Sequence, residues 1–189
     1  MQTGAFSYCS NLITVSLATC SSIGNYAFYG CSSLSDLYAP KCESVGSYAF
    51  RGCGFVSVNL PKCSYLSYGA FSDCRQLTTI SLPNCSYFSG EVFAYCSQLS
   101  SIYAPMLTHI SSLGYNCNKI TSLSLPRIQV VDYCAFQNCA NLQAFEFSTV
   151  QSVGAYAFYG CYNLSGSANL MNCSYIGDYA FSDCSNITE

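Results

Sequence analysis

The chain has 189 residues, of which 51% are apolar and only 8% are charged, and its net charge is −3. This length allows one domain with a continuous core. The absence of a basic cluster argues against nucleic acid as a partner, and the apolar stretches are too short to span a membrane. The opening residues, MQTGAFSYCSNL, lack the basic and apolar regions of a signal peptide, so we expect none in this chain. With so few charges, surface polarity must come mainly from Ser, Asn, Thr and Tyr.

A motif built around phenylalanine recurs every 21 to 23 residues, as in GAFSDCRQLTTISLPNC (69–85). Between Phe93 and Phe136 the gap is 43 residues, and HISSLGYNC (109–117) fills it with a unit in which Gly114 or Tyr115 replaces the phenylalanine. The chain thus holds about nine units, the last cut short, and such repetition predicts a solenoid. The anchor phenylalanines are Phe6, Phe28, Phe50, Phe71, Phe93, Phe136, Phe158 and Phe181.

Each unit is expected to contain one short strand, which in most units ends at a proline because proline has no N–H to give to a sheet. In LTTISLP (77–83), Ile80 and Leu82 are two residues apart and therefore point to the same, inward face. The remainder of a unit is too short for a long helix, so we expect turns, short extended segments or one helical turn there. The other inward pairs, in chain order, are Val15/Leu17, Val58/Leu60, Ile102/Ala104, Leu123/Leu125 and Phe145/Phe147.

The fifteen cysteines fall mostly into two columns of the repeat, and the first column lies three residues after each anchor phenylalanine. The second column accepts Leu107, Ile128 or Val150 in three units, which indicates buried thiols that pack as small apolar side chains. Some disulfides are the alternative, since stacked strands are close enough to be bridged. A metal site is disfavoured, because there is no CxxC pair and only one histidine. Cys134 lies outside both columns, and an exposed thiol is an alternative at that position.

The combination of L-x-x-I-x-L-P with I-G-x-x-A-F-x-x-C-x-x-L resembles the BspA-type leucine-rich repeat, as in SYFSGEVFAYCSQLSSIYAP (86–105) and SVGSYAFRGCGFVSVNLP (44–61). The resemblance covers residues 1–189 as one leucine-rich-repeat domain and implies a right-handed solenoid of about nine coils. It implies a parallel β-sheet on the concave side, and turns with short irregular or 3-10 segments on the other. Members of this family are often surface-exposed or secreted proteins implicated in adhesion, so the resemblance implies the cell surface or the exterior as the location.

No constellation of catalytic residues is visible. His109 is the single histidine and has no evident partner group, so we interpret it as a surface or turn residue. The carboxylates fall mostly at different phases of the repeat, and neither a nucleophile motif nor a phosphate-binding loop is present. We therefore expect no catalysis, no cofactor and no metal ion. Four N-x-S/T sequons, which chance explains in a chain rich in Asn and Ser, begin at Asn84, Asn163, Asn172 and Asn186.

The strand positions that face away from the core are the candidate binding surface. They are polar and nearly uncharged, and tyrosine combined with Ser and Asn suits the binding of a protein loop or a glycan. The alternative is that short hydroxyl side chains merely solvate a strand face. The candidate ligand-binding residues are Asp36, Tyr38, Asn59, Thr79, Ser81, Ser101, Tyr103, Ser124 and Glu146.

Both ends of the chain fall inside a unit and lack a polar cap, so we expect a fragment or an uncapped repeat array. We predict a non-catalytic binding module that makes protein–protein or adhesive contacts, with a protein or glycan on a host or neighbouring cell as its partner. The alternative is a structural rod, a homo-oligomer that associates through its open ends. The tyrosines away from the strand face are expected to pack between coils rather than to bind a ligand, namely Tyr26, Tyr48, Tyr156 and Tyr179.

Overall fold

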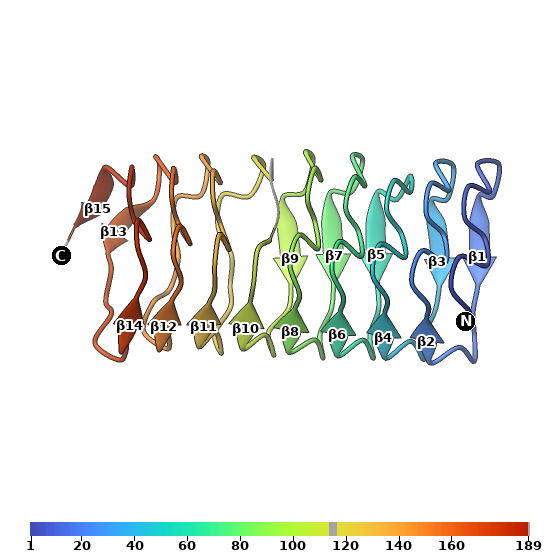
Figure 1. Cartoon of the computed structure of the whole chain (residues 1–189), viewed down its shortest axis with the longest axis horizontal. Coiled ribbons are helices and arrows are strands. Elements are labelled where there is room, and N and C mark those ends of the chain that lie inside the picture. Colours follow the sequence, from blue (N-terminus) through green and yellow to red (C-terminus); the bar gives the residue numbers. More distant parts are fainter. Residues whose placement is uncertain (114–116, 189) are drawn as a thin grey trace.

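The structure is a computed structural model that describes residues 1–113 and 117–188. It is a parallel β-solenoid of about eight turns, and the described residues contain no helix. The coils stand side by side along one long axis, with the two termini at opposite ends (Figure 1). The expected replacement of an anchor phenylalanine by Gly114 or Tyr115 lies outside the described residues.

A three-residue strand recurs along the solenoid, and in the N-terminal coils its middle residue points inward, as the spacing predicts. Val58 and Ile80 are only 5% and 2% exposed. The parallel register places equivalent positions side by side, so that Val58 pairs with Ile80 and Ile80 pairs with Ile102. The strands are β1 (Thr14–Ser16), β3 (Asp36–Tyr38), β5 (Ser57–Asn59), β7 (Thr79–Ser81), β9 (Ser101–Tyr103), β13 (Ser165–Ser167) and β15 (Asn186–Thr188).

These three-residue strands do not form one continuous sheet. They pair as β1–β3, β5–β7–β9 and β13–β15. Between β9 and β13, one isolated bridge joins Ser122 to Ala144. The interruption begins in the unit whose sequence lacks an anchor phenylalanine, at the place where its three-residue strand would lie.

A continuous eight-stranded sheet forms on a second side of the coils, in the order β14-β12-β11-β10-β8-β6-β4-β2. Each of its strands has two residues, and in most of them the second residue is buried, as Val45 and Leu66 are. Of the options that the sequence leaves open for this side, turns and short extended segments are the ones that form. The strands are β2 (Ser22–Ile23), β4 (Ser44–Val45), β6 (Tyr65–Leu66), β8 (Tyr87–Phe88), β10 (His109–Ile110), β11 (Val130–Val131), β12 (Ser152–Val153) and β14 (Tyr175–Ile176).

The anchor phenylalanines stack into the core ladder that the repeat predicts. The ring centroids of Phe28 and Phe50 are 5.3 Å apart, and those of Phe50 and Phe71 are 5.2 Å apart. All three side chains are fully buried. Each stacked pair contributes about 0.5–1.5 kcal/mol beyond the burial of apolar surface, so neighbouring coils that both carry the phenylalanine are held to each other through the core.

Each of these phenylalanines lies between two residues of left-handed backbone. Around Phe28 they are Tyr26, with φ of 55°, and Gly30, with φ of 71°. The N–H groups of Tyr26, Phe28 and Gly30 all donate to carbonyl oxygens of the next coil, at 2.7 to 2.9 Å. The turn therefore extends the hydrogen bonding between coils beyond the two sets of strands.

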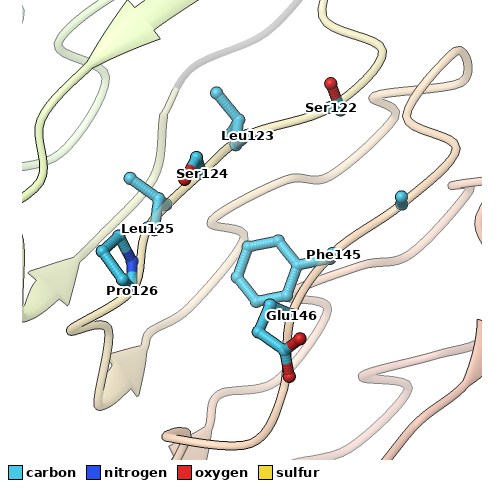
Figure 2. A pocket seen from close by; sticks show the side chains of 8 residues that line it. Ser122, Leu123, Ser124, Leu125, Pro126, Phe145 and Glu146 are labelled. Carbon is cyan, nitrogen blue, oxygen red and sulfur yellow. The ribbon is translucent and has the colours of Figure 1, made fainter.

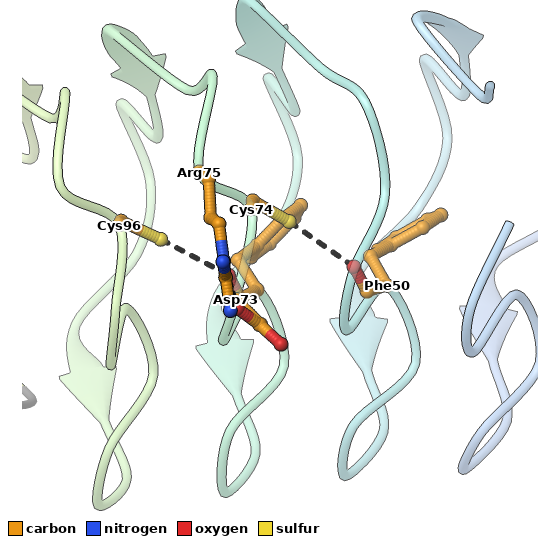
Figure 3. A network of polar contacts seen from close by, with 6 residues as sticks. Phe50, Asp73, Cys74, Arg75 and Cys96 are labelled. Carbon is orange, nitrogen blue, oxygen red and sulfur yellow. Dashed lines mark hydrogen bonds and ion pairs between the residues drawn. The ribbon is translucent and has the colours of Figure 1, made fainter. Parts of the chain in front are cut away.

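The first cysteine column adds a side-chain hydrogen bond between coils. The thiol of Cys74 donates to the carbonyl of Phe50 one coil back at 3.1 Å, and the thiol of Cys96 points toward the coil of Asp73 and Cys74 (Figure 3). In the second column, the thiol of Cys85 donates to a carbonyl two residues ahead in its own coil. All fifteen cysteines are free thiols. Cys134 is only 5% exposed, so the exposed alternative considered for it is not what the structure shows.

Candidate ligand-binding surface

The structure brings most of the predicted binding residues onto one face. Thr79 lies opposite Ser101, and Ser81 lies between Asn59 and Tyr103 in the parallel register. In the first pair of strands, Asp36 lies opposite Thr14 and Tyr38 lies opposite Ser16. The two tyrosines of this face, Tyr38 and Tyr103, are each 58% exposed. We call these outward residues of β1, β3, β5, β7 and β9 the strand face.

The hydroxyl groups next to the strand face already have acceptors within the solenoid. Thr78 Oγ1 donates to the carbonyl of Val56 one coil back at 2.9 Å, and Ser100 Oγ donates to the carbonyl of Thr78 at 3.2 Å. Similar bonds in a second column run from Ser86 and Thr108. The Ser and Thr content of this weakly charged chain thus serves partly to bond successive coils.

The side chains of the strand face make no such bonds. Within the described residues, the polar groups of Asn59, Thr79, Ser81 and Ser101 take part in no side-chain hydrogen bond, and Asp36 forms no ion pair. The hydroxyls of Thr78 and Thr79 are neighbours in sequence, yet only the first is satisfied within the protein. The strand face therefore carries donors and acceptors that remain available to a partner.

The two remaining predicted residues, Ser124 and Glu146, line a hollow where the three-residue strands are interrupted. The hollow has a volume of about 400 Å³ and lies between residues 122–126 and 144–146. Figure 2 shows the two stretches side by side, with the Phe145 ring and the Glu146 carboxylate on the second one. Glu146 is not free, because its carboxylate accepts the Ser148 backbone N–H at 3.0 Å, which holds the pKa of the Glu146 carboxyl below its usual range.

His109 has neighbours that the sequence interpretation did not supply. It lies on β10, its ring centroid is 4.7 Å from that of Tyr87, and its Nε2 is 3.6 Å from Asp132 Oδ2. The interpretation of His109 as a residue without a partner group was therefore wrong. His109 and Asp132 are about one repeat apart in the sequence, and residues one repeat apart lie on neighbouring coils. The period of the repeat was therefore the signal that could have found this contact.

Most of the buried cysteines are poor candidates for chemistry. Burial raises the pKa of the Cys42, Cys74 and Cys139 thiols, each to about 12. Since the thiolate is the nucleophile and the metal ligand, these protonated thiols contribute packing and hydrogen bonds. Within residues 1–113 and 117–188, no group of three or more His, Cys, Asp or Glu side chains could hold a metal ion.

The sequons coincide with a structural role for asparagine. The side-chain amide of Asn163 donates to the carbonyl of Ala140 at 2.9 Å, and that of Asn186 donates to the carbonyl of Tyr162 at 2.9 Å. The amides of Asn84 and Asn172 make equivalent bonds to the preceding coil. The side chains of all four asparagines therefore hydrogen-bond one coil to the next.

The fold and its polar strand face define a leucine-rich-repeat solenoid, the class to which several similar solved structures belong. A leucine-rich-repeat protein of Treponema pallidum is 24% identical with a TM-score of 0.62, over 95% of this chain and 78% of that chain. A leucine-rich cell surface protein from Faecalibacterium prausnitzii is 19% identical with a TM-score of 0.56, over 96% of this chain and 65% of that one. A leucine-rich-repeat protein from Bacteroides ovatus is 24% identical with a TM-score of 0.53, over 97% of this chain and 61% of that one. The chain thus spans less than two thirds of the last two proteins.

The sequence itself identifies the family. Residues 1–114 and 110–189 match the BspA type leucine-rich-repeat region in six copies. The chain therefore belongs to the BspA-type leucine-rich-repeat family. No curated protein sequence gives a significant match.

Membership of this family carries general properties. Leucine-rich repeats commonly serve as protein–protein interaction modules and are generally non-enzymatic, and proteins of the BspA type are typically found at the cell surface or secreted. The described residues contain no helix that could cross a lipid bilayer.

Proposed function

We propose that this chain is a non-catalytic binding module that holds a partner protein on the strand face, in adhesive contact at a cell surface. The observation that carries the proposal is the contrast between Thr78, whose hydroxyl is bonded within the solenoid, and Thr79, Ser81 and Asn59, whose polar groups are not. Unsatisfied hydroxyl and amide groups give adaptable hydrogen bonds to a partner.

The tyrosines supply the apolar part of the proposed interface. Tyr38 and Tyr103 are largely exposed and make no ring contact with another aromatic side chain among the described residues. Tyrosine offers a large contact area at a low cost in side-chain entropy. With Asp36 as the single charged residue on β1 to β9 of this face, we expect a partner surface that is polar and weakly charged.

The test compares a strand-face variant with a matched control on an array of extracellular and surface proteins. The strand-face variant is Tyr38→Ala with Tyr103→Ala, and the control is Tyr162→Ala with Tyr175→Ala, which removes tyrosines that are 52% and 57% exposed outside this face. We expect saturable binding of the unmodified chain and of the control, and a loss of at least about tenfold in affinity for the strand-face variant, since interface tyrosines often contribute 2 kcal/mol or more.

Equal binding by both double variants, or no saturable binding by the folded unmodified chain, would contradict the proposal. Sedimentation velocity on the same samples separates partner binding from self-association, which stays a prediction. Reversible growth with concentration, in the presence of reductant and without any partner, would favour the structural rod.

A further inference from the structure

A second polar hollow lies away from the strand face, over three successive phenylalanine turns. It has a volume of about 500 Å³. Four of its six lining residues are tyrosines, and they come from the turns around Phe6, Phe28 and Phe50, which follow one another along the solenoid. The lining residues are Ser7, Tyr8, Tyr26, Tyr29, Tyr48 and Arg51. We call them the tyrosine–arginine hollow.

Arg51 is held by aromatic rings and by no carboxylate. Its guanidinium carbon lies 5.4 Å from the centroid of the Tyr29 ring and 5.7 Å from that of Tyr48. Among the described residues Arg51 forms no ion pair, whereas Arg75 is bonded to Asp73 at 2.7 Å. Stacking against ring faces leaves the N–H donors at the edge of a guanidinium free to bind an acceptor.

Three tyrosines of the hollow have a left-handed backbone conformation. Tyr8, Tyr26 and Tyr48 have φ of 60°, 55° and 54°, and Gly4 and Gly69 occupy the position of Tyr26 in other coils. Glycine adopts this conformation freely, while another L-residue loses about 1–2 kcal/mol there. The same conformation recurs at the equivalent positions of other coils, as at Glu91, Tyr156 and Tyr179, so it belongs to the repeat, and the hollow is distinguished by which side chains its turns carry.

The chemistry of the hollow defines the ligand. One unpaired guanidinium matches one negative charge, and its planar fork of N–H donors fits a carboxylate in bidentate geometry. The electron-rich faces of the tyrosine rings suit the positively polarised C–H face of a pyranose. We propose that the tyrosine–arginine hollow binds a carboxylated pyranose, such as a uronic or sialic acid residue of an acidic glycan.

The C-terminal half carries a natural comparison. Tyr156 lies 5.8 Å from Tyr159 and 5.1 Å from Tyr179, much as Tyr26 lies 5.8 Å from Tyr29 and 5.5 Å from Tyr48. Ser182 stands where Arg51 stands, and the Asp183 carboxylate acts on Tyr159 strongly enough to raise the pKa of that phenol. This second cluster has the rings without the cation, so it is not expected to take an acidic sugar.

The experiment titrates the chain with two acidic probes and their neutral counterparts, followed by ligand-observed NMR and calorimetry. The probes are trigalacturonate with its methyl ester, and sialyllactose with lactose. We expect saturable binding of at least one acidic probe, weakened about tenfold or more by Arg51→Gln and by Tyr29→Ala, because a charge-assisted bond and its aromatic support are lost. Arg75→Gln and Tyr159→Ala are the matched controls and should bind like the unmodified chain.

Binding of trigalacturonate alone would assign the site to uronic acids, binding of sialyllactose alone would assign it to sialic acids, and binding of both would assign it to carboxylated pyranoses in general. Binding of neither acidic probe would overturn the proposal. So would equal affinity for an acidic probe and its neutral counterpart, or an unchanged affinity in Arg51→Gln. Arg51→Lys, which keeps the charge and removes the fork, should lie between the unmodified chain and Arg51→Gln, and it serves as the second variant if Arg51→Gln does not fold.

Discussion

Cys74 fills a buried position and also donates its S–H to the carbonyl of Phe50 in the preceding coil. The first column holds cysteine in every unit, while Leu, Ile or Val replaces cysteine in the second column in three units. The structure gives a physical reason for this difference, since the first-column thiol of Cys74 donates to a carbonyl of the preceding coil, whereas the second-column thiol of Cys85 donates to a carbonyl of its own coil.

Cys74→Val should destabilise the chain more than Cys85→Val does. Both changes keep an apolar side chain of similar size, but the first removes a hydrogen bond between coils, which contributes about 0.5–1.5 kcal/mol. The Phe50 carbonyl keeps the Cys53 backbone N–H as a donor at 3.2 Å. The second changes a position whose equivalent is Val150, and it should cost less than about 1.5 kcal/mol. Urea unfolding of the two variants in reductant measures both values, and equal losses would show that the thiol–carbonyl bond contributes nothing.

Residue types alone predicted the buried thiols and the outward tyrosines, because both follow from columns of the repeat. They did not predict His109 beside Asp132, or the asparagine amides that bond successive coils. Those contacts depend on which side chains can reach across to a neighbouring coil. The period of the repeat indicates which residues lie on neighbouring coils, but which side-chain atoms meet there becomes visible only in the structure.

At the scale of the element, the inward pairs before the prolines were predictable because a strand of three residues still shows a period of two. The strands of the eight-stranded sheet have two residues each, and two residues show no period. The hollow beside Ser124 and Glu146 could not be predicted for a different reason, since it depends on the loss of strand pairing between β9 and β13.

Gly46 and Gly52, at the two ends of one turn, should each destabilise the chain when replaced, for different reasons. At Gly52 φ is 73° and an added Cβ would lie 3.8 Å from the nearest atom, so Gly52→Ala should cost about 1–2 kcal/mol through the backbone alone. At Gly46 an added Cβ would lie 2.7 Å from the backbone nitrogen of Asn25, so Gly46→Ala should cost about 1–3 kcal/mol through overpacking.

Replacement by asparagine separates the two causes. Asparagine tolerates the left-handed region, and Asn138 occupies the position of Gly52 in another coil with φ of 59°. Gly52→Asn should therefore be more stable than Gly52→Ala, and Gly46→Asn less stable than Gly46→Ala, in thermal unfolding. The same rank order at both sites would contradict this account.

At the scale of the whole molecule, the buried thiols make stability depend on alkaline pH. The pKa of Cys42 is raised by burial from an ordinary value of 9.0 to about 12. The unfolded chain therefore loses this proton above pH 9 while the folded chain keeps it. Stability should be full below pH 9 and should fall as the pH rises toward 12, by up to about 1.4 kcal/mol per pH unit for each such thiol.

The measurement is the urea midpoint between pH 8 and pH 10.5 in reductant, for the unmodified chain and for Cys42→Val. Cys42→Val should lose stability less steeply, because one fewer proton is released on unfolding, and tyrosine ionisation is common to both chains. Parallel slopes would mean that the Cys42 thiol is not protected by burial.

The register that stacks Phe28 on Phe50 also stacks Phe50 on Phe71 and Phe136 on Phe158. Each seam between two coils that both carry the anchor phenylalanine is thus made by the same columns of residues. A genetic crossover that keeps the phase of the repeat would join two coils that already fit each other. Array length is then a quantity that recombination can change in whole units, lengthening or shortening a surface without the invention of a new core.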